Sequence, residues 1–477
     1  MTGGKDKEIP LSPPLSKGEI KGGFGREKMS TLRKILIMLL YFAALLAASA
    51  LAADSGKSDL SASDFPSIQA ALDALPPGGG RVYIPAGTYV LKSSLKPRDN
   101  VTICGAGPST VLRACDLVTG KTTSQMNVGD KQVDVENTAG FEVGMDVFVH
   151  KNIEWGPCVE KAFSYAITAI EGNTLKFDKA AAAGQPAGAT ACTGAPLILV
   201  LNRRNVVIEN LTVDGNRKPD WVYVNLKMAG IYLWGANDCT VRSCNVINTS
   251  GDGISAQFPP SGWKGADGPM GWAVPEKHGG NGTMILDNHI SNTSGFGIHI
   301  GGGQTKSIIK GNIVSKCLWD GFYWCWDNVM TIVTDNIFTH NGWNGIGGFG
   351  DGSSAFSDTH NINSNNVCAY NGQAGIAITV GNSNIVSGNM CFANSRSAKG
   401  EYPGIKVWIP GPDKNEPDKK YFINTLITGN VCSDVGEGAT QKNGIDVAEN
   451  IRGVILRDNI SEGNMGQDIL PAADSGD

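Results

Sequence analysis

The sequence predicts an all-β solenoid, in which short strands stack turn upon turn along one axis. From about residue 205 a unit recurs every 23 or 24 residues, as in the step from Asn288 to Asn312. Each unit contains about three short apolar stretches divided by Gly and Asn, and 62 of the 477 residues are Gly. Strands this short cannot bury a face alone, but stacked turns can, with about 4.8 Å between equivalent strands.

Two marks define the unit, an Asn at one bend and a Gly-Ile pair before the last strand. Asn tolerates the left-handed backbone conformation, and stacked Asn side chains can hydrogen-bond along the axis. We therefore interpret the repeated Asn residues as architectural. They are Asn210, Asn245, Asn288, Asn312, Asn336, Asn366, Asn389, Asn430 and Asn459.

The N-terminus predicts export to the periplasm or the medium. Arg33 and Lys34 precede the apolar run 35–53, which ends in the A-x-A-like stretch 50–52. We interpret 29–53 as a signal peptide and expect no membrane contact after cleavage. An uncleaved anchor is the alternative, because nineteen apolar residues can just span a bilayer. Residues 1–28 are interpreted as a non-native or disordered leader.

Composition and charge limit the classes of partner and cofactor that we expect. The net charge is −5 and no long basic cluster lies beyond the N-terminus, so no nucleic-acid partner is expected. The six His have no zinc spacing and no loop has calcium-ligand spacing, so we predict no cofactor and leave calcium open.

Cysteine usage gives two further expectations. The eleven Cys are an odd number, and an exported chain can form disulfides, for which Cys158 and Cys192 are the best pair. Cys368, Cys391 and Cys432 each follow a repeated Asn by two residues. We expect these three to stack as buried free thiols rather than to bind a metal.

Two segments carry a family resemblance. DFPSIQAALDALPPGGGRVYIPAGTYVL (64–91) and VTICGAGPSTVL (101–112) resemble the N-terminal cap and first coils of the pectate-lyase-like (pectin-lyase-fold) superfamily. The resemblance covers about 64–112 and 199–465. It implies a right-handed parallel β-helix with an N-terminal capping helix, and a groove on one face that acts on carbohydrate.

The specific motifs of known members are not in the sequence. We find neither the paired Asp, Gly-His-Gly and Arg-x-Lys pattern of polygalacturonases nor the clustered carboxylates and paired Arg of calcium pectate lyases. The Asp-Pro-His motif of alginate epimerases is missing as well. No active site can therefore be carried over from the superfamily.

The repeat also sets the expected domains. We assign the cap helix and first coils to 54–112 and the parallel β-helix repeats to 199–470. Between them, 113–198 breaks the period and alternates like antiparallel strands, which predicts an inserted small β subdomain.

Alternation within the strand after Gly-Ile predicts which residues face outward. In DGFYWCWDN (320–328), Phe322 and Trp324 are expected to fill the cylinder and Tyr323 to face out. Long loops at 258–281, 350–358, 394–402, 409–421 and 434–442 border this strand and are expected to wall a groove. The outward row reads Tyr232, Ser255, His299, Tyr323, Gly347, Ala377, Lys406 and Asp446.

A sugar chain suits such a groove, because Trp and Tyr rings stack on pyranose faces while polar groups bind hydroxyls. For each aromatic side chain the alternative is packing beneath a loop. The expected substrate-binding residues are Tyr232, Trp234, Gln257, Trp326, Trp343, Asp351 and Trp408.

The catalytic candidates form two sets. His299 and Tyr323 lie on successive turns, about 5 Å apart, and could remove and deliver protons in an elimination. Lys406, three turns from Tyr323 and on the order of 14 Å away, could bind a substrate carboxylate. Asp252 and Asp320 share a slot two turns apart, roughly 9.6 Å, near the separation in inverting glycosidases, unless they only cap turns.

The sequence therefore predicts an exported carbohydrate-active enzyme, either a polysaccharide lyase or a glycoside hydrolase. Its partner would be a polysaccharide, with uronic-acid residues favoured, cleaved by β-elimination or hydrolysis. A sugar epimerase and a non-catalytic, adhesin-like glycan-binding protein are the alternatives. The sequence names neither the sugar nor the oligomeric state.

Overall fold

The computed structural model describes residues 58–470 with internal gaps. The predicted leader and signal peptide, Cys158, Trp326 and Asp351 lie outside the described residues. Within the described part, no helix is long and apolar enough to cross a membrane. The gaps are 152–163, 182–183, 195, 219–227, 258–281, 302, 326–327, 350–357, 380, 409–420, 436–437 and 467.

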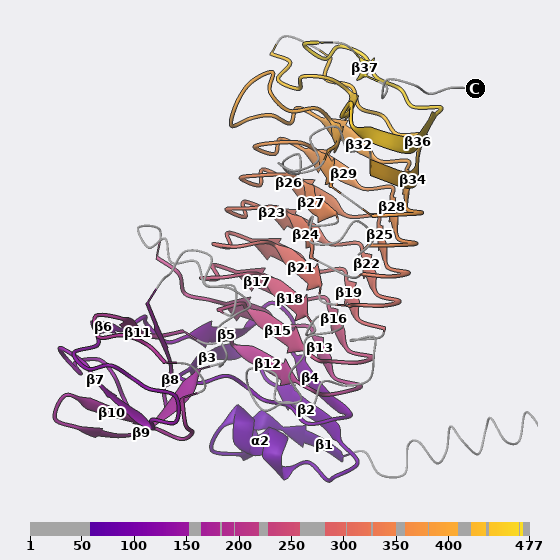
Figure 1. The fold of residues 1–477 in the computed structure, drawn as a ribbon. Helices are drawn as coiled ribbons and strands as arrows, with labels where there is room; N and C mark the ends of the chain where they lie inside the picture. The colour runs from indigo at the N-terminus through magenta and orange to yellow at the C-terminus, as the bar shows by residue number, and fades with distance from the viewer. Residues whose placement is uncertain are drawn as a thin grey trace, which may run out of the picture. The chain divides into compact units, whose positions relative to one another are not determined.

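The chain folds as a right-handed parallel β-helix, with an N-terminal helix and an additional small sheet (Figure 1). Three parallel sheets run along it. The first, called the long sheet, contains β1 (Ser58–Ser61), β2 (Gly80–Ile84), β4 (Val101–Gly105), β13 (Val207–Glu209), β16 (Thr240–Arg242), β19 (Met284–Leu286), β22 (Ile308–Lys310), β25 (Ile332–Thr334), β28 (Ile362–Ser364), β31 (Ile385–Ser387), β34 (Tyr421–Thr428) and β36 (Ile451–Arg457).

The second and third sheets complete each turn. The second sheet contains β3 (Gly87–Leu91), β5 (Thr110–Ala114), β14 (Thr212–Asp214), β17 (Asn245–Ile247), β20 (His289–Ser291), β23 (Ile313–Ser315), β26 (Ile337–Thr339), β29 (Val367–Ala369) and β32 (Met390–Phe392). The third, called the site sheet, contains β12 (Ile198–Leu201), β15 (Ile231–Trp234), β18 (Ile254–Gln257), β21 (Ile298–Gly301), β24 (Phe322–Trp324), β27 (Ile346–Phe349), β30 (Ile376–Ile378), β33 (Ile405–Val407), β35 (Ile445–Val447) and β37 (Ile469–Leu470).

A short helical segment packs against the first turn. It consists of the 3-10 helix η1 (Ala62–Asp64) and helix α2 (Ile68–Ala74). The Ser67 hydroxyl accepts a hydrogen bond from the Ala70 amide at 3.1 Å and so caps α2. Ile68 and Leu72 are buried in the same apolar core as the strands, so α2 covers the apolar interior of the first coil.

A separate six-stranded antiparallel sheet lies between β5 and β12 in the sequence. Its strands are β6 (Thr119–Lys121), β7 (Gln132–Asp134), β8 (Asp146–His150), β9 (Tyr165–Glu171), β10 (Thr174–Phe177) and β11 (Thr190–Thr193). Met126, Val147 and Leu175 are among the buried residues of its own core. This sheet therefore has a hydrophobic centre distinct from that of the β-helix.

The interior of the β-helix follows the predicted alternation. Phe322 and Trp324 are both fully buried, and their ring centroids lie 5.3 Å apart in an edge-to-face contact. Cys368, Cys391 and Cys432 are buried in the same core as free thiols, and Cys368 pairs with Cys391 in register. The expected thiol stack is therefore confirmed, and burial raises the pKa of Cys368 well above its usual value.

Seven side chains form an Asn ladder at the bend between the long and second sheets. The Nδ2 of each donates to the Oδ1 of the next at 2.9–3.0 Å. The same Oδ1 accepts a backbone N–H, as in the 2.9 Å bond from Asn312 N to Asn336 Oδ1. The Asn ladder comprises Asn288, Asn312, Asn336, Asn366, Asn389, Asn430 and Asn459.

Two details of the Asn prediction are wrong. The left-handed residue is the one before the ladder Asn, for example Asp335 at φ 57°, and only Asn210 among the predicted Asn residues is itself left-handed, at φ 54°. Asn210 and Asn245 lie outside the ladder, since it is the Cys244 N–H that bonds Asn288 Oδ1, at 3.0 Å. A second ladder, which the repeat did not predict, joins Asn341, Asn371, Asn394, Gln441 and Asn464.

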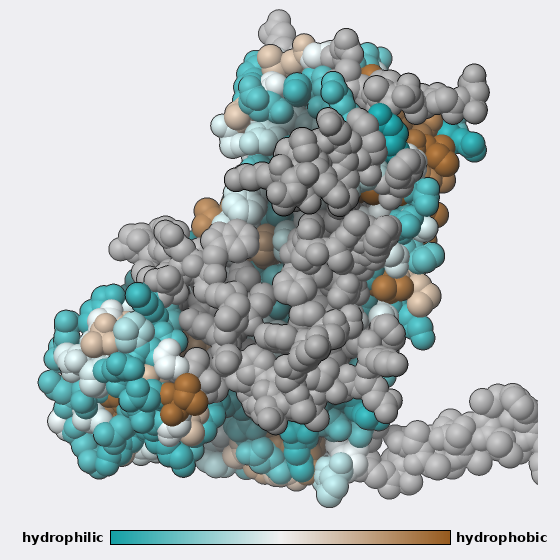
Figure 2. All heavy atoms as spheres, in the orientation of Figure 1, coloured by the Kyte–Doolittle hydropathy of each residue, from teal (hydrophilic) through white to brown (hydrophobic). Residues whose placement is uncertain are grey.

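The outer face of the long sheet carries an aliphatic row. Ile308, Ile385 and Ile455 in this row are 37–48% exposed. Figure 2 shows hydrophobic residues gathered along the edge where β28, β34 and β36 lie. The row is formed by Ile308, Ile332, Ile362, Ile385, Leu426 and Ile455, which pair rung by rung.

We expect Asn336→Ala to lower stability by at least about 2 kcal/mol, because Asn312 would be left with buried donors that have lost their acceptor. Urea unfolding followed by circular dichroism measures the change. Asn245→Ala is the matched control, since that half-buried Asn is outside the ladder and makes only a 3.4 Å contact with Thr212. Equal losses in the two variants would contradict a structural role for the ladder.

Candidate functional site

The candidate site lies on the outer face of the site sheet, where β18, β21, β24 and β27 stack. The register places Ser255, His299, Tyr323 and Gly347 on successive rungs. His299 and Tyr323 are neighbours as predicted, with ring centroids 5.2 Å apart and planes at 82°. His299 is 2% exposed and Tyr323 is half-buried, so Tyr323 is the more accessible of the two.

Asp252 orients the His299 ring from the turn that precedes β18. Its Oδ2 lies 2.9 Å from His299 Nδ1, and its Oδ1 accepts the Phe296 backbone N–H at 3.1 Å. Both groups are buried, at 0% and 2% exposure. Asp252 therefore caps the following turn and fixes an imidazole ring at the same time.

Gln257 also contacts the imidazole. Its amide nitrogen lies 2.9 Å from His299 Nδ1, 3.0 Å from His299 Nε2 and 3.1 Å from the Ser255 hydroxyl oxygen. The Tyr232 hydroxyl donates to Gln257 Oε1 at 3.2 Å. Asp252 and Gln257 thus both bind the imidazole ring and fix its position.

Aromatic rings surround the pair, and sequence reasoning missed two of them. Phe296 stacks on Tyr323 with centroids 4.1 Å apart, and Trp319 stacks on Trp343 at 5.3 Å. Phe296 contacts Trp319 edge-on at 4.9 Å. Trp319 and Trp343 occupy equivalent places in the repeat, 24 residues apart, which indicates that their rings stack. The outward direction of side chains was predicted only for strand residues, so this stacking was missed.

Asp320 lies beside this cluster and is 2% exposed. Its Oδ1 accepts the backbone N–H of Asn344 at 2.7 Å and the Asn344 side-chain amide at 2.8 Å. Burial raises the pKa of Asp320 to about 7, although the two hydrogen bonds from Asn344 favour the charged form. Like Asp252, Asp320 caps the next turn, in agreement with the alternative that these two residues cap turns. Such capping is compatible with a catalytic role.

Lys406 lies on the same row, three rungs beyond Tyr323. Its ammonium stands 4.1 Å from the centroid of the Trp408 ring, a cation–π contact. Burial lowers the pKa of Lys406, and the charge of Asp446 on the next rung opposes that shift. Lys406 and Trp408 form a second polar-aromatic patch, separate from the His299 cluster.

The expectation of exposed aromatic platforms is wrong for Tyr232 and Trp234. They are 2% and 7% exposed and pack with Leu199 and Ala229 in a small apolar cluster outside the cylinder. They face outward as predicted, but they are buried rather than exposed. Gln257 is 5% exposed and belongs to the His299 network.

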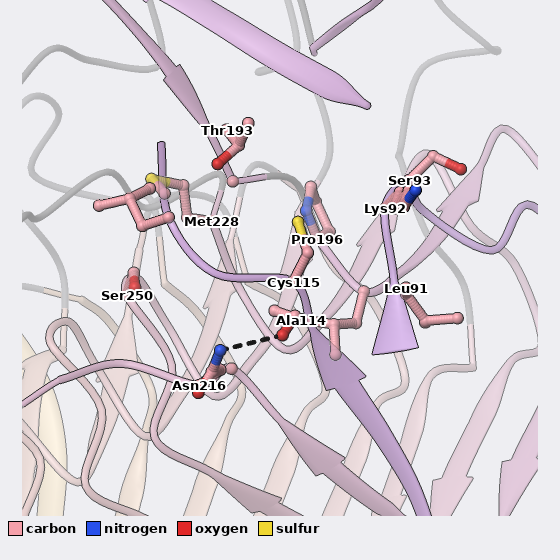
Figure 3. Close-up of a pocket in the computed structure, with 14 residues that line it drawn as sticks. Leu91, Lys92, Ser93, Ala114, Cys115, Thr193, Pro196, Asn216, Met228 and Ser250 are labelled. Atoms are coloured by element: carbon pink, nitrogen blue, oxygen red, sulfur yellow. Dashed lines mark hydrogen bonds between the residues drawn. The ribbon is translucent and has the colours of Figure 1, made fainter. Parts of the chain in front are cut away.

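A small cavity lies elsewhere, at the start of the β-helix (Figure 3). It has a volume of about 50 Å³, which suits water rather than a sugar ring. Cys115, Asn216 and Met228 help to line it, and Asn216 donates to the Ala114 carbonyl at 3.2 Å. None of its lining residues belongs to the His299 cluster.

No metal centre is formed by the part of the chain that the structure describes, since no three His, Cys, Asp or Glu side chains there are placed to hold one ion. Calcium binding therefore stays open, as it was in the prediction from sequence. Similarly, the Cys158–Cys192 bridge stays a prediction.

We expect wild-type stability to fall relative to Asp320→Asn as pH rises from about 4 to about 7. The folded pKa of about 7 lies above the ordinary value of 3.8, so the protonated folded form is favoured at low pH and that advantage is lost as pH rises. Between pH 5 and pH 8 the loss is about 2–3 kcal/mol. Urea unfolding at both pH values measures it. Asp335→Asn, at an exposed corner, is the control, and an equal pH dependence in both variants would refute the assignment.

Comparisons with known proteins agree with the architecture. No protein-family model matches the chain, and no curated protein matches it. The fold is similar to two Azotobacter vinelandii structures. The mannuronan C-5 epimerase AlgE4 A-module is 17% identical, with a TM-score of 0.50 over 88% of this chain and 97% of its own. The AlgE6 A-module is 16% identical, with a TM-score of 0.51 over 87% and 100%. At this identity the likeness establishes the parallel β-helix fold alone.

Proposed function

We propose that this protein is a carbohydrate-active enzyme that removes the proton next to the carboxylate of a uronic-acid residue in a polysaccharide. The observation that carries the proposal is the contact of His299, fixed by Asp252, with the more accessible Tyr323. Positioned imidazole and phenol groups can both transfer protons in a reaction.

The elimination proceeds as follows. A base takes the C5 proton, the electron pair forms a C4–C5 double bond, and the C4–O glycosidic bond breaks. The leaving oxygen then takes a proton. We assign the contact with the sugar to Tyr323, which is the more accessible of the two, and we assign to His299 the support of the phenol's charge and proton.

The neighbouring side chains support sugar binding. The stacked pair Trp319 and Trp343 is half-buried beside the reacting groups and offers an aromatic surface for a pyranose ring. Lys406, three rungs away, could hold the carboxylate of a more distant residue. A polysaccharide lying along the row would contact both.

Hydrolysis by paired carboxylates has less support. Both oxygens of Asp252 are already engaged, one with His299 and one with the Phe296 amide. Asp252 is thus occupied in orienting and capping rather than placed to activate water. Asp320 alone cannot supply both the acid and the base.

Epimerisation at C5 is the second candidate, because it begins with the same proton abstraction. Two structural neighbours are named mannuronan C-5 epimerases, which supports a uronate polymer as substrate. Export to the periplasm or medium is part of the proposal and is supported by the apolar run 35–53.

We expect Tyr323→Phe and His299→Ala to lower turnover by about 10²–10⁴-fold, because each removes a proton-transfer group. The substrates are a panel of uronic-acid polysaccharides. Tyr370→Phe is the control, since Tyr370 is 42% exposed just after β29 of the second sheet, and it should keep wild-type turnover.

Three readouts separate the reactions. Ultraviolet absorbance of an unsaturated uronate reports elimination, and new reducing ends without absorbance report hydrolysis. Deuterium from heavy water at C5 of an uncut chain reports epimerisation. Binding without any of the three signals would indicate a non-catalytic glycan-binding protein and would overturn the proposal.

A further inference from the structure

The Asp320 carboxyl group occupies the position in the outer row where the side chain of residue 347 would lie. A Cβ on Gly347 would stand 2.5 Å from Asp320 Cγ, so the carboxyl group fills the space that a side chain at 347 would take. Gly347 pairs with Tyr323 across the rung. The Asp320 carboxyl group therefore lies in the outer row next to the position of Tyr323, in the space of the side chain that Gly347 of the following turn lacks.

Two consecutive glycines make this arrangement possible. Gly348 has φ 68°, and a Cβ there would stand 2.1 Å from Tyr323 Cε2. The Tyr323 ring thus lies against Gly348 while the Asp320 carboxyl group lies against Gly347. A side chain at either position would displace one of the two groups.

The hydrogen bonds of Asp320 are one-sided. Both donors from Asn344 reach Oδ1, and no described residue donates to Oδ2. Among the described residues no Lys or Arg forms an ion pair with this carboxyl group. Among the described residues, the ionisable groups around it are Tyr323, His299 and Asp252 on the preceding turns, and the Cys317 thiol, whose pKa both carboxylates raise.

We propose that Asp320, in its protonated form, donates a hydrogen bond from Oδ2 to the carboxylate of the uronate residue that meets Tyr323. This inference rests on the proposed function and names the group that selects an acidic sugar. An O–H···O⁻ bond between a carboxylic acid and a carboxylate is short and strong. Burial favours the protonated form near neutral pH.

The same bond would assist the reaction. Removal of the C5 proton moves negative charge onto the substrate carboxylate, and a fixed donor at that oxygen stabilises the charge as it develops. An ionised Asp320 would instead repel the substrate, so activity should decline as pH rises past about 7. A neutral sugar would leave the Asp320 donor without a partner.

The decisive variant is Asp320→Asn, which keeps the shape and a hydrogen-bond donor but cannot ionise. We expect it to retain activity within about tenfold at pH 6 and to lose the decline above pH 7. Asp320→Leu and Gly347→Ala should lose about 10²-fold or more, the first by removing the donor and the second by displacing it. Asp146→Asn, a buried carboxyl in the six-stranded sheet, is the control and should keep the wild-type pH profile.

A second arm tests selectivity. In binding affinity, wild type and Asp320→Asn should prefer a uronate polymer over its carboxyl-reduced form, whereas Asp320→Leu should lose most of that preference. An Asp320→Asn protein that folds, as thermal unfolding would show, yet is inactive at every pH would overturn the proposal, because Asp320 would then be needed as an anion. An unchanged pH profile in Asp320→Asn would overturn it too.

The experiments distinguish a failure of the proposed function from a failure of the role proposed for Asp320. If wild type is active and Tyr323→Phe is not, the proton-transfer proposal stands whatever Asp320→Asn does. If wild type neither turns over nor binds any uronate polymer, both proposals are overturned.

Discussion

In-register stacking of parallel strands is the constraint on which the rest of this structure depends. Each rung pairs a residue with its equivalent one turn away, so a choice of residue is repeated as a row. The interior becomes a continuous apolar column, and one bend becomes the Asn ladder. The outer face of the site sheet then brings residues from separate turns into contact, as with His299 and Tyr323.

Stability and chemistry share residues in the candidate site. Asp252 and Asp320 both cap the turn that follows them, through Phe296 and Asn344 respectively. Asp252 also orients His299, while Asp320 is buried without a counter-ion among the described residues. A carboxyl group held this way destabilises the folded state at neutral pH, which is a common trade at functional sites.

The repeat made much of this predictable from sequence. Its phase gave the fold, the burial of Phe322 and Trp324, and the contact of His299 with Tyr323, because strand alternation and turn spacing are local rules. It did not give the burial of Tyr232, because alternation says which way a side chain points and not what packs against it. The 24-residue spacing of Trp319 and Trp343 signalled their stacking, but both precede the strands for which alternation gives a direction. The place of Asp320 was hidden as well, because it depends on a side chain that Gly347 lacks.

The Asn ladder gives the stack a direction. Six of its side-chain amides, from Asn288 through to Asn430, donate to the next Asn toward the C-terminal end, so these hydrogen bonds run head to tail. Asn459 ends the row and donates back to the Ile427 carbonyl. Aligned hydrogen bonds polarise one another, so each amide strengthens its neighbours' bonds. Replacing an Asn near the middle would divide the ladder into two shorter rows of hydrogen bonds, whereas replacing one at an end would only shorten the ladder. The Asn ladder is therefore a polar row along the bend of the solenoid, and its hydrogen bonds stabilise the fold more together than the same bonds would singly.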